Sequence, residues 1–496
     1  MVDMDLFGTA GIRGGVEDRV TPALALAVGR AVGAEIRSRG GAGESTPEST
    51  VVLARDGRVT GPALAAAMEA GLAAGGVAVR RAGQLPTPAL AHASQGRYGV
   101  MLTASHNPPT DNGIKLFRDG TEFDREAERA VESRVADEES VAPWDEWTEA
   151  TRADPLTGYL DDVREYAERF GAPLDGLRVA VDCGNGMSAP ATPTVLRELG
   201  ADVVTLNGNV DGHFPGRGSK PTPETLADLR AFVADANEGV AEPGRPAAED
   251  GSASADGETE GFAFGIGHDG DADRIVIVDA DGEVVHEDTV LAVLAERYTR
   301  ESAATDPVVV TTPNASGRID ERVRDAGGRV ERVRLGALHE GIAAVREAAA
   351  DADGAGGDDT RVVFAAEPWK HIHVGFGGWI DGVTSAAVIA RLVADEGLDA
   401  LREPVTERPY RKVSVSCPDD AKESVMDRLE TALPGAFPDA AVDTDHGVRL
   451  EFDDASWTLV RPSGTEPYVR VYAESDDVDA LVADVEDVVE DAVAAA

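Results

Sequence analysis

One pattern of apolar and polar positions occurs three times along the chain. Each copy begins with a short apolar strand, at 51–54, 178–182 and 308–311. A polar loop and a helix-like stretch follow, the latter at 62–74, 190–199 and 318–326. A glycine stop then leads to a second strand, at 77–79, 203–206 and 329–333. Strand, helix and strand in this order form the βαβ unit, which builds mostly parallel sheets covered by helices. The pattern predicts three related α/β domains.

The last ninety residues have a different pattern. Short strand-like runs are close together there, with one helix-like stretch after the first strand and an acidic one at the end of the chain. This pattern favours a smaller α+β domain. The predicted fold is therefore α/β, with four domains at 1–152, 153–283, 284–402 and 403–496. Residues 237–261 are rich in Gly, Ala, Ser, Pro and acids, so we expect a flexible insertion there.

The charge is strongly negative, with 46 Lys and Arg against 91 Asp and Glu and a formal net charge of −45. Such acidity disfavours nucleic acid or an anionic membrane as the main partner. Only five positions are lysine, and acid excess with few lysines favours adaptation to concentrated salt; a merely acidic, very soluble protein is the alternative. The N-terminus lacks a signal-peptide pattern, and no charge-free apolar run reaches 18 residues. We expect a soluble cytoplasmic protein.

The first candidate for chemistry is TASHNP at 103–108, which follows the apolar run YGVML. A hydroxyl presented by a turn after a strand, here that of Ser105, serves as a nucleophile or phosphate carrier. Taken alone, Ser105 is equally well interpreted as a cap that opens a following helix. Lys115 comes ten residues later, where an ammonium can bind phosphate or transfer a proton.

The second candidate is GHDGDADR at 267–274, where three acids alternate: Asp269, Asp271 and Asp273. Curled around a tight turn, these carboxylates offer oxygen ligands to one hard cation such as Mg²⁺, Ca²⁺ or Mn²⁺. An EF-hand is excluded because its Gly and Glu positions are Arg274 and Ala280. A dinucleotide loop is excluded because the segment leads into a strand. Ordinary turn chemistry is the alternative.

Two further loops carry polar clusters. In EPWKHIHVGFGGWIDG at 367–382, Glu367, Lys370 and His371 form a candidate ligand loop; His371 and His373 lack a third zinc ligand nearby. In RPSGTEPYVRVYAE at 461–474, hydroxyls and a glycine turn lie between two arginines. Such a loop suits a phosphate monoester, and a surface turn is the alternative.

Together, FGTAGIRG at 7–14, TASHNP, DGDADR at 269–274 and RPSGTEP at 461–467 resemble the motifs of the α-D-phosphohexomutase family. This family includes phosphoglucomutase, phosphomannomutase and phosphoglucosamine mutase. The resemblance covers essentially the whole chain. It implies three similar α/β domains and a smaller fourth domain around a central cleft, in agreement with the repeated pattern.

The resemblance also implies a role for each matching residue. Ser105 would be the phosphoserine, supported by His106 and Asn107. The Mg²⁺ ligands would be the Ser105 phosphate, Asp269, Asp271 and Asp273. The transferring phosphate or its protons would be handled by Arg13, Lys115, His106, Arg274 and His371. The substrate would be bound by Glu367, Lys370, Arg461, Ser463, Gly464, Thr465 and Arg470.

The implied reaction moves a phosphoryl group within a small sugar phosphate. Phospho-Ser105 would give its phosphoryl group to the sugar, and the resulting hexose 1,6-bisphosphate would return the other phosphate. The free bisphosphate is expected to activate the enzyme, whose state is predicted to be monomer or homodimer. A metal-dependent phosphatase using the same residues, and a non-catalytic sugar-phosphate binder, are the competing hypotheses.

One departure bears on the choice of sugar. The family's sugar loop usually reads Gly-Glu-x-Ser-Gly-His, whereas residues 366–371 read Ala-Glu-Pro-Trp-Lys-His. The Glu-Pro start looks like archaeal members assigned to glucosamine phosphates, so glucosamine phosphate is the first choice and glucose or mannose phosphate the alternative. Trp369 is expected to stack on the sugar. Six cations are expected to line one basic cleft: Arg13, Lys115, Arg274, Lys370, Arg461 and Arg470.

Overall fold

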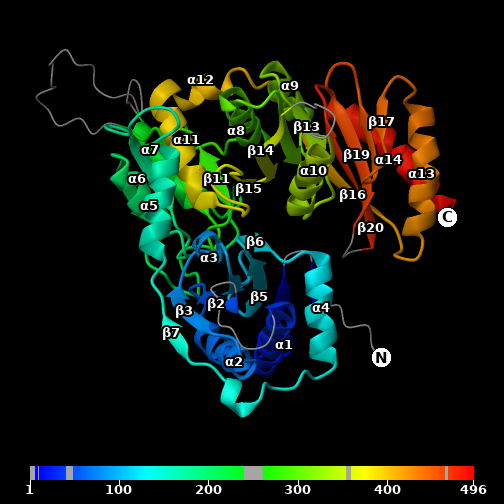
Figure 1. The fold of residues 1–496 in the computed structure, drawn as a ribbon. Helices are drawn as coiled ribbons and strands as arrows, with labels where there is room; N and C mark the ends of the chain where they lie inside the picture. Colours follow the sequence, from blue (N-terminus) through cyan, green and yellow to red (C-terminus); the bar gives the residue numbers. More distant parts are fainter. Residues whose placement is uncertain are drawn as a thin grey trace, which may run out of the picture. The chain divides into compact units, whose positions relative to one another are not determined.

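The computed structural model describes residues 6–8, 11–40, 49–238, 261–352, 359–463 and 467–495. The predicted insertion at 237–261 lies almost entirely outside these ranges. The chain divides into two compact units. Figure 1 labels their helices and strands along the chain. The first unit consists of Met1–Val285 and Trp369–Leu401, and the second of His286–Pro368 and Arg402–Ala496. In the described residues, no helix is long and apolar enough to cross a membrane.

The first unit contains two sheets. The larger has the order β1 (Ile12–Gly15), β5 (Asp111–Arg118), β4 (Tyr98–Leu102), β2 (Val51–Arg55), β3 (Val79–Gln84) and β7 (Ala150–Arg152), with β6 (Thr121–Glu122) beside β5. Strands β4, β2, β3 and β7 are parallel, whereas β5 is antiparallel to both β1 and β4. Its helices are α1 (Pro22–Gly40), α2 (Gly61–Ala74), α3 (Thr87–Ala93) and α4 (Arg125–Ala136).

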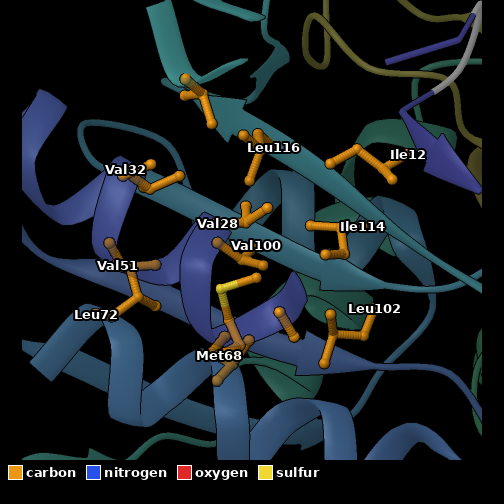
Figure 2. Close-up of a cluster of buried hydrophobic side chains, with 14 of the residues drawn as sticks. Ile12, Val28, Val32, Val51, Met68, Leu72, Val100, Leu102, Ile114 and Leu116 are labelled. Atoms are coloured by element: carbon orange, nitrogen blue, oxygen red, sulfur yellow. The ribbon is translucent and has the colours of Figure 1, made fainter. Parts of the chain in front are cut away.

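Apolar side chains at helical spacing on α2 are part of the core of this sheet, to which α1 and the strands also contribute (Figure 2). Leu64, Met68 and Leu72 are at most 1 % exposed. Helix α1 packs closely on α2 because glycines meet at the crossing, where a Cβ on Gly71 would come within 2.4 Å of the Leu26 carbonyl oxygen. The apolar side chains of α2 are thus its contact with the sheet.

The second sheet of the first unit has the order β11 (Ile275–Val278), β10 (Phe264–His268), β8 (Arg178–Asp182) and β9 (Asp202–Leu206). Strands β10, β8 and β9 are parallel, and β11 returns antiparallel to β10. The remaining elements are α5 (Leu156–Ala167), α6 (Thr192–Glu198), α7 (Ala227–Asn237), β15 (Lys370–Ile372) and α11 (Gly382–Glu396). Helix α12 (Leu398–Arg402) leads from the first unit into the second.

The second unit also contains two sheets. In one, β13 (Arg329–Arg332), β12 (Asp306–Thr311) and β14 (Thr360–Glu367) are parallel, with helices α8 (Glu287–Glu301), α9 (Gly317–Asp325) and α10 (Leu338–Ala352). The other is antiparallel, in the order β16 (Tyr410–Ser416), β20 (Tyr468–Glu474), β19 (Trp457–Pro462), β18 (Val448–Glu451) and β17 (Ala441–Asp443). It is packed by α13 (Lys422–Ala436) and α14 (Val478–Ala494).

The predicted fold class is confirmed. The strand pairs β2–β3, β8–β9 and β12–β13, which correspond to the three repeats, are all parallel. The C-terminal sheet is antiparallel, as an α+β domain requires. One strand was placed too early: β3 begins at Val79 and ends at Gln84, where the prediction gave 77–79. The sequence of β3 is rich in arginine and largely exposed, which is unusual for a strand inside a sheet. It nevertheless pairs with β2 on one side and with β7 on the other.

Candidate functional site

Ser105 lies in the turn between β4 and β5, at the carboxyl end of β4. It is fully buried, and its φ of 50° lies in the left-handed region, at a cost of about 1–3 kcal/mol for a residue with a Cβ. Its hydroxyl donates to Asp269 Oδ2 at 2.6 Å. The element that follows is a strand, so the interpretation of Ser105 as a helix cap is wrong. The strained turn instead aims the hydroxyl at the acidic loop.

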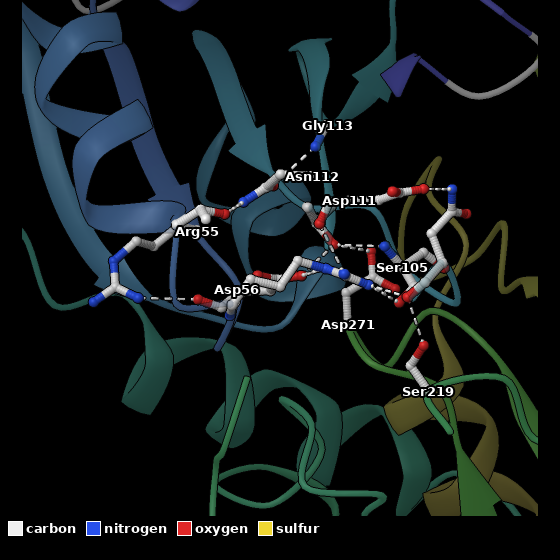
Figure 3. Close-up of polar contacts among 12 residues, drawn as sticks. Arg55, Asp56, Ser105, Asp111, Asn112, Gly113, Ser219 and Asp271 are labelled. Atoms are coloured by element: carbon white, nitrogen blue, oxygen red, sulfur yellow. Dashed lines mark hydrogen bonds and ion pairs between the residues drawn. The ribbon is translucent and has the colours of Figure 1, made fainter. Parts of the chain in front are cut away.

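Arg58 holds the backbone of this turn in place. Figure 3 shows the polar contacts around the turn, with Asp56, Ser105 and Asp111 labelled. Its side chain is fully buried, and Nε donates to Asp56 Oδ2 at 3.0 Å. Its four terminal N–H groups donate to the carbonyl oxygens of Ser105, Asn107, Pro108 and Asp111, over 2.6–2.9 Å. All five donors of the guanidinium are therefore used on one neighbouring carboxylate and one loop. Arg58 fixes the backbone that presents Ser105.

Asp56 and Arg58 were not predicted from the sequence, although a signal was present. Both directly follow the strand β2, and Ser105 follows β4, which is the parallel neighbour of β2. The carboxyl ends of adjacent parallel strands meet at one edge of a sheet. An Asp-Gly-Arg turn after the first repeat's strand was therefore a candidate partner for the Ser105 turn.

Two threonines connect these loops to the acidic cluster. Thr103 Oγ1 lies 2.8 Å from Asp56 Oδ2 and 3.2 Å from Asp271 Oδ2, and it accepts the Ser105 N–H at 2.9 Å. Thr87 Oγ1 donates to Asp271 Oδ2 at 2.7 Å. These contacts fix one oxygen of Asp271 and leave its other oxygen for a ligand.

The three aspartates converge as the sequence predicts. They occupy the turn between β10 and β11, which pair as antiparallel neighbours. Asp269, Asp271 and Asp273 are buried, and one oxygen of each lies within 4.8 Å of the others. A Cβ on Gly270 would come within 2.6 Å of the Ser105 carbonyl oxygen. The glycine therefore lets the acidic turn approach the Ser105 turn.

The charges of this cluster favour the binding of a cation. Burial raises the pKa of Asp269 well above its usual range, and repulsion from Asp273 and Asp271 raises it further. Burial also favours the neutral form of Asp273, but Lys115, Arg274 and Lys370 outweigh it and lower this pKa. The Oδ1 atoms of Asp271 and Asp273 are buried with no hydrogen-bond partner among the described residues. Oxygen-only donors with unused lone pairs fit a hard divalent ion.

Cationic side chains surround the cluster. Lys115 Nζ lies 2.9 Å from Asp273 and 3.9 Å from Asp271. Although burial lowers the pKa of Lys115, these acids and Glu122 outweigh it and raise the pKa, so the ammonium stays charged. Arg274 Nε lies 3.9 Å from both Asp269 and Asp273. The site thus balances three buried acids with nearby positive charge.

The remaining predicted residues of the first unit lie around the same turns. His106 Nδ1 lies 3.2 Å from Ser105 Oγ, and burial, Arg274 and Arg13 lower the pKa of His106 to about 3. Arg13 lies on β1, opposite Gly113 of β5. Lys370 pairs with Arg274 in a β-bridge, beside the acidic turn.

The loop 367–371 is divided between the two units. Glu367 belongs to the second unit, where its Oε1 accepts the Gly336 N–H at 2.6 Å. Lys370 and His371 belong to the first. Trp369 has a φ of 68° and packs against the hydrophobic cluster of the second sheet. Its half-buried ring therefore contributes to that core, and stacking on a sugar stays a prediction.

The second unit carries the other predicted phosphate loop. Arg461 on β19 and Arg470 on β20 are directly opposite each other. Arg461 donates to the Tyr472 hydroxyl at 3.2 Å and Arg470 to the Tyr468 hydroxyl at 2.7 Å. Like charges in this arrangement repel unless an anion joins them.

Ser463 follows β19 and is 5 % exposed. Lys422, which was not among the predicted site residues, donates to the Ser463 carbonyl at 2.6 Å. Its rarity was the available signal, since it is one of only five lysines in the chain. Gly464 and Thr465 lie outside the described residues.

Comparison with known proteins assigns the family. Residues 4–142 and 157–282 match domains I and II of the model described as phosphoglucomutase/phosphomannomutase, alpha/beta/alpha, and residues 413–492 match its C-terminal domain. A protein named "Probable phosphoglucosamine mutase" from Methanopyrus kandleri is 40% identical over 479 residues, covering 95% of this chain and 94% of the relative. The chain belongs to the phosphoglucomutase/phosphomannomutase family.

Other relatives and structures agree with this assignment. A phosphopentomutase from Thermococcus kodakarensis is 38% identical over 483 residues, with coverage of 95% and 94%. The crystal structure of a family protein from Burkholderia thailandensis has a TM-score of 0.77 at 24% identity and covers 100% of this chain and 98% of its own, which shows the shared fold. As a phosphohexomutase-family member, the protein is an intramolecular phosphotransferase.

The predicted site residues thus form two groups. The first unit brings together Ser105, His106, Lys115, Arg274 and the three aspartates, with Arg13 and Lys370 nearby. The second unit brings together Arg461, Arg470 and Ser463. That all six selected cations line a single cleft stays a prediction.

Proposed function

We propose that this protein interconverts glucosamine 6-phosphate and glucosamine 1-phosphate through a phosphoserine at Ser105 and a bisphosphate intermediate. The proposal is carried by one observation: in a chain of this family, a buried, strained serine hydroxyl lies 2.6 Å from a cluster of three buried aspartates. A hydroxyl whose backbone is held by Arg58 and that is surrounded by Lys115, Arg274 and His106 suits repeated gain and loss of a phosphoryl group.

In the proposed reaction, the phosphoryl group of phospho-Ser105 passes to the free hydroxyl of the sugar phosphate. The sugar oxygen forms the new P–O bond and loses its proton, while the bond to Ser105 Oγ breaks. The bisphosphate then turns in the site, and its other phosphoryl group returns to Ser105. Lys115 and Arg274 offset the charge of the group in transfer, which is the main source of catalysis for such reactions.

The acidic cluster is proposed to hold Mg²⁺. The ligands would be Asp269, Asp271, Asp273 and an oxygen of phospho-Ser105, and the ion would stabilise negative charge on the transferring group. The donor set fits, because all ligands are oxygens and two of them have no hydrogen-bond partner among the described residues. A relative's crystal structure, that of Aspergillus fumigatus N-acetylphosphoglucosamine mutase, was determined in complex with GlcNAc-6P and magnesium.

Arg461, Arg470 and the loop 463–465 are proposed to bind the phosphate that does not react. The facing arginines support this role, because a dianion between them would replace repulsion with charge-assisted hydrogen bonds. Glu367, Lys370 and His371 are proposed to contact the sugar or its protons.

The choice of sugar is tested by a panel of substrates. Glucosamine, glucose and mannose 1-phosphates, and ribose 1-phosphate because one relative is a phosphopentomutase, would be assayed with Mg²⁺ and the matching bisphosphate. We expect the highest kcat/KM for glucosamine 1-phosphate. A higher value for any other sugar would reassign the substrate.

The same assay separates the mutase from a phosphatase. The mutase requires stimulation by small amounts of the sugar bisphosphate, which phosphorylates Ser105. Free phosphate as the main product would establish the phosphatase instead. A purified protein that stays unphosphorylated and loses nothing on Ser105→Ala would be a binder without activity.

Adaptation to salt and cytoplasmic location are proposals as well. The net charge of −45 supports the first, because screening at molar salt relieves repulsion among the acids. We expect activity and thermal stability to rise from low to molar KCl. A decline over that range would contradict the proposal.

A further inference from the structure

Two buried histidine rings both lie within hydrogen-bond distance of one serine hydroxyl. That serine is on the helix that packs on the acidic turn. His371 Nδ1 lies 3.0 Å from Ser385 Oγ, and His373 Nε2 lies 2.8 Å from the same atom. Both rings are 1 % exposed, and Ser385 is fully buried. All three residues belong to the first unit.

Ser385 lies in the first turn of α11, which packs directly on the acidic loop. A Cβ on Gly382, the first residue of this helix, would come within 2.7 Å of the Arg274 carbonyl oxygen and 2.9 Å of that of Ala272. Asp381 caps the helix by accepting the Thr384 N–H at 2.8 Å. The helix start is thus fixed against the loop that carries the three aspartates.

Asp381 is itself held rigidly. Its carboxylate also accepts the Tyr159 hydroxyl at 2.8 Å and the Trp379 indole N–H at 3.0 Å. Its backbone N–H donates to the His371 carbonyl at 2.8 Å. Hydrogen bonds therefore join the start of the helix to the strand that carries His371.

The hydrogen-bond network assigns the tautomer of His371. The Ser385 hydroxyl donates its single proton to the Asp381 carbonyl oxygen at 2.7 Å. A serine oxygen can then only accept further hydrogen bonds, so both imidazoles must donate to it. His371 accordingly carries its proton on Nδ1, and His373 on Nε2. In neutral His371 the lone pair is on Nε2.

We propose that Ser385 is a positioning residue: its hydroxyl locks His371 as the Nδ1–H tautomer, so that Nε2 is the atom that takes and returns the proton of the sugar hydroxyl. This inference deepens the proposed function and rests on it. His373 already holds a proton on Nε2, so it cannot relieve His371 of one through Ser385. A proton taken up by Nε2 therefore leaves by the same atom.

That property suits a mutase. When the sugar hydroxyl attacks phospho-Ser105, the bond from phosphorus to Ser105 Oγ breaks and the hydroxyl proton moves to Nε2 of His371. Ser105 Oγ keeps the electron pair until it takes up the second phosphoryl group. When the bisphosphate returns its other phosphoryl group, the sugar oxygen that is released regains a proton from the same nitrogen. Burial lowers the pKa of His371 to about 3, so the ring begins neutral and returns its proton readily.

The tautomer is measured directly by ¹⁵N NMR of the full-length wild-type protein with labelled histidine, the His371 signals being assigned with His371→Asn. We expect an Nδ1–H, Nε2-bare ring. An Nε2–H ring would overturn the proposal. This readout needs no substrate, so it stands or falls separately from the mutase activity, whose own failure would be the absence of product from every sugar phosphate.

The variant Ser385→Ala tests the consequence. Without the hydroxyl, the Nε2–H form, which free histidine prefers, becomes populated, and we expect kcat to fall about 10–100-fold with KM within about twofold. Ser385→Thr, which keeps the hydroxyl, should restore most of kcat and the Nδ1–H signal. An unchanged kcat for Ser385→Ala, or an equal fall for Ser385→Thr with the Nδ1–H signal retained, would contradict the role.

Thr299→Val is the matched control. Thr299 is 2 % exposed and its hydroxyl donates to the carbonyl four residues earlier in α8, as that of Ser385 does in α11. The Thr299→Val variant removes the same kind of intrahelical hydrogen bond in the second unit. We expect kcat to stay within twofold and the His371 signals to stay unchanged. If Ser385→Ala and Thr299→Val lowered kcat equally, loss of packing would explain both.

Discussion

The two loops proposed to hold phosphate are built differently. Around Ser105, a strained turn is buried, and its carbonyls are held by one guanidinium and its hydroxyl by one carboxylate. Around Ser463, two facing arginines donate to tyrosine hydroxyls. The first arrangement fixes one atom in one place, as bond formation requires. The second provides charge on side chains that are less confined, as recognition of a group that does not react allows.

The largest loss of kcat should follow from removing the Ser105 hydroxyl. Ser105→Ala leaves no acceptor for the phosphoryl group, so we expect kcat to fall by about 10⁴-fold or more. Intact-mass analysis should show loss of the phosphorylated form. Ser424→Ala on α13, whose exposed hydroxyl caps a local turn, should keep both. Persistent phosphorylation of Ser105→Ala would place the carrier elsewhere.

The next effect tests the support of that turn. Arg58→Lys keeps the charge but offers three donors in place of five, so some of the loop carbonyls lose their partner. We expect kcat to fall about 10²–10³-fold and the free energy of unfolding by about 2–4 kcal/mol, measured by steady-state kinetics and urea unfolding.

The matched control for Arg58 lies in the second unit. Arg449 is also buried, donating to the Pro313 and Ala315 carbonyls and lying over the Trp457 ring. Arg449→Lys should lower stability by a similar amount while kcat changes less than about threefold. Equal losses of kcat in both variants would mean that Arg58 acts only through overall stability.

Changes in the loop around Ser463 should alter KM for the sugar phosphate. Arg470→Met removes one of the two facing cations, and we expect KM for the sugar phosphate to rise about 10–100-fold, since a hydrogen bond to a charged group contributes about 1.5–3 kcal/mol. We expect kcat to stay within about threefold, because the proposed reacting group is elsewhere. A fall in kcat at constant KM would instead place Arg470 at the reacting phosphate.

The last contrast concerns pH, for which the two units are predicted to differ in sign. In the second unit, burial and Glu287 raise the pKa of Asp288 to about 8. The folded state then binds this proton more tightly than the unfolded state, so the contribution of Asp288 to stability falls as the pH rises from about 4 to 8. In the first unit, burial lowers the pKa of His268 to about 4. Its contribution is present above about pH 6.5 and is lost as the pH falls toward 4.

Two variants test this contrast in urea unfolding at several pH values. Asp288→Asn should gain stability relative to the wild-type protein at pH 8, by about 2–4 kcal/mol, with the gain disappearing toward pH 4. His268→Gln should reduce the loss of stability between pH 6.5 and 4.5. A pH-independent difference between Asp288→Asn and the wild-type protein would mean that Asp288 is not buried as a carboxyl group.

Much of the fold and part of the site were predictable because they depend on local patterns. The three βαβ repeats follow from periodicity, and the convergence of Asp269, Asp271 and Asp273 follows from alternate positions around one tight turn. Arg58 and Ser385 were not predicted, because the groups they hold are distant in the chain. The Ser105 carbonyl is 47 residues from Arg58, and the two histidines are 12–14 residues from Ser385. For Arg58 the only signal was its place directly after the strand that neighbours β4, and a lone serine such as Ser385 gives no indication of which distant groups it will meet.

The amino-acid sequence by itself determined the fold class, the excess of acid and the order of the four motifs, since each is carried by residues close together in the chain. The tertiary structure decided which loops meet at one sheet edge, that Trp369 packs in a core, and that Ser385 bridges two histidines. The physical reason is that hydrogen-bond geometry and burial depend on where strands and helices place distant residues, and pairing within a sheet sets those positions.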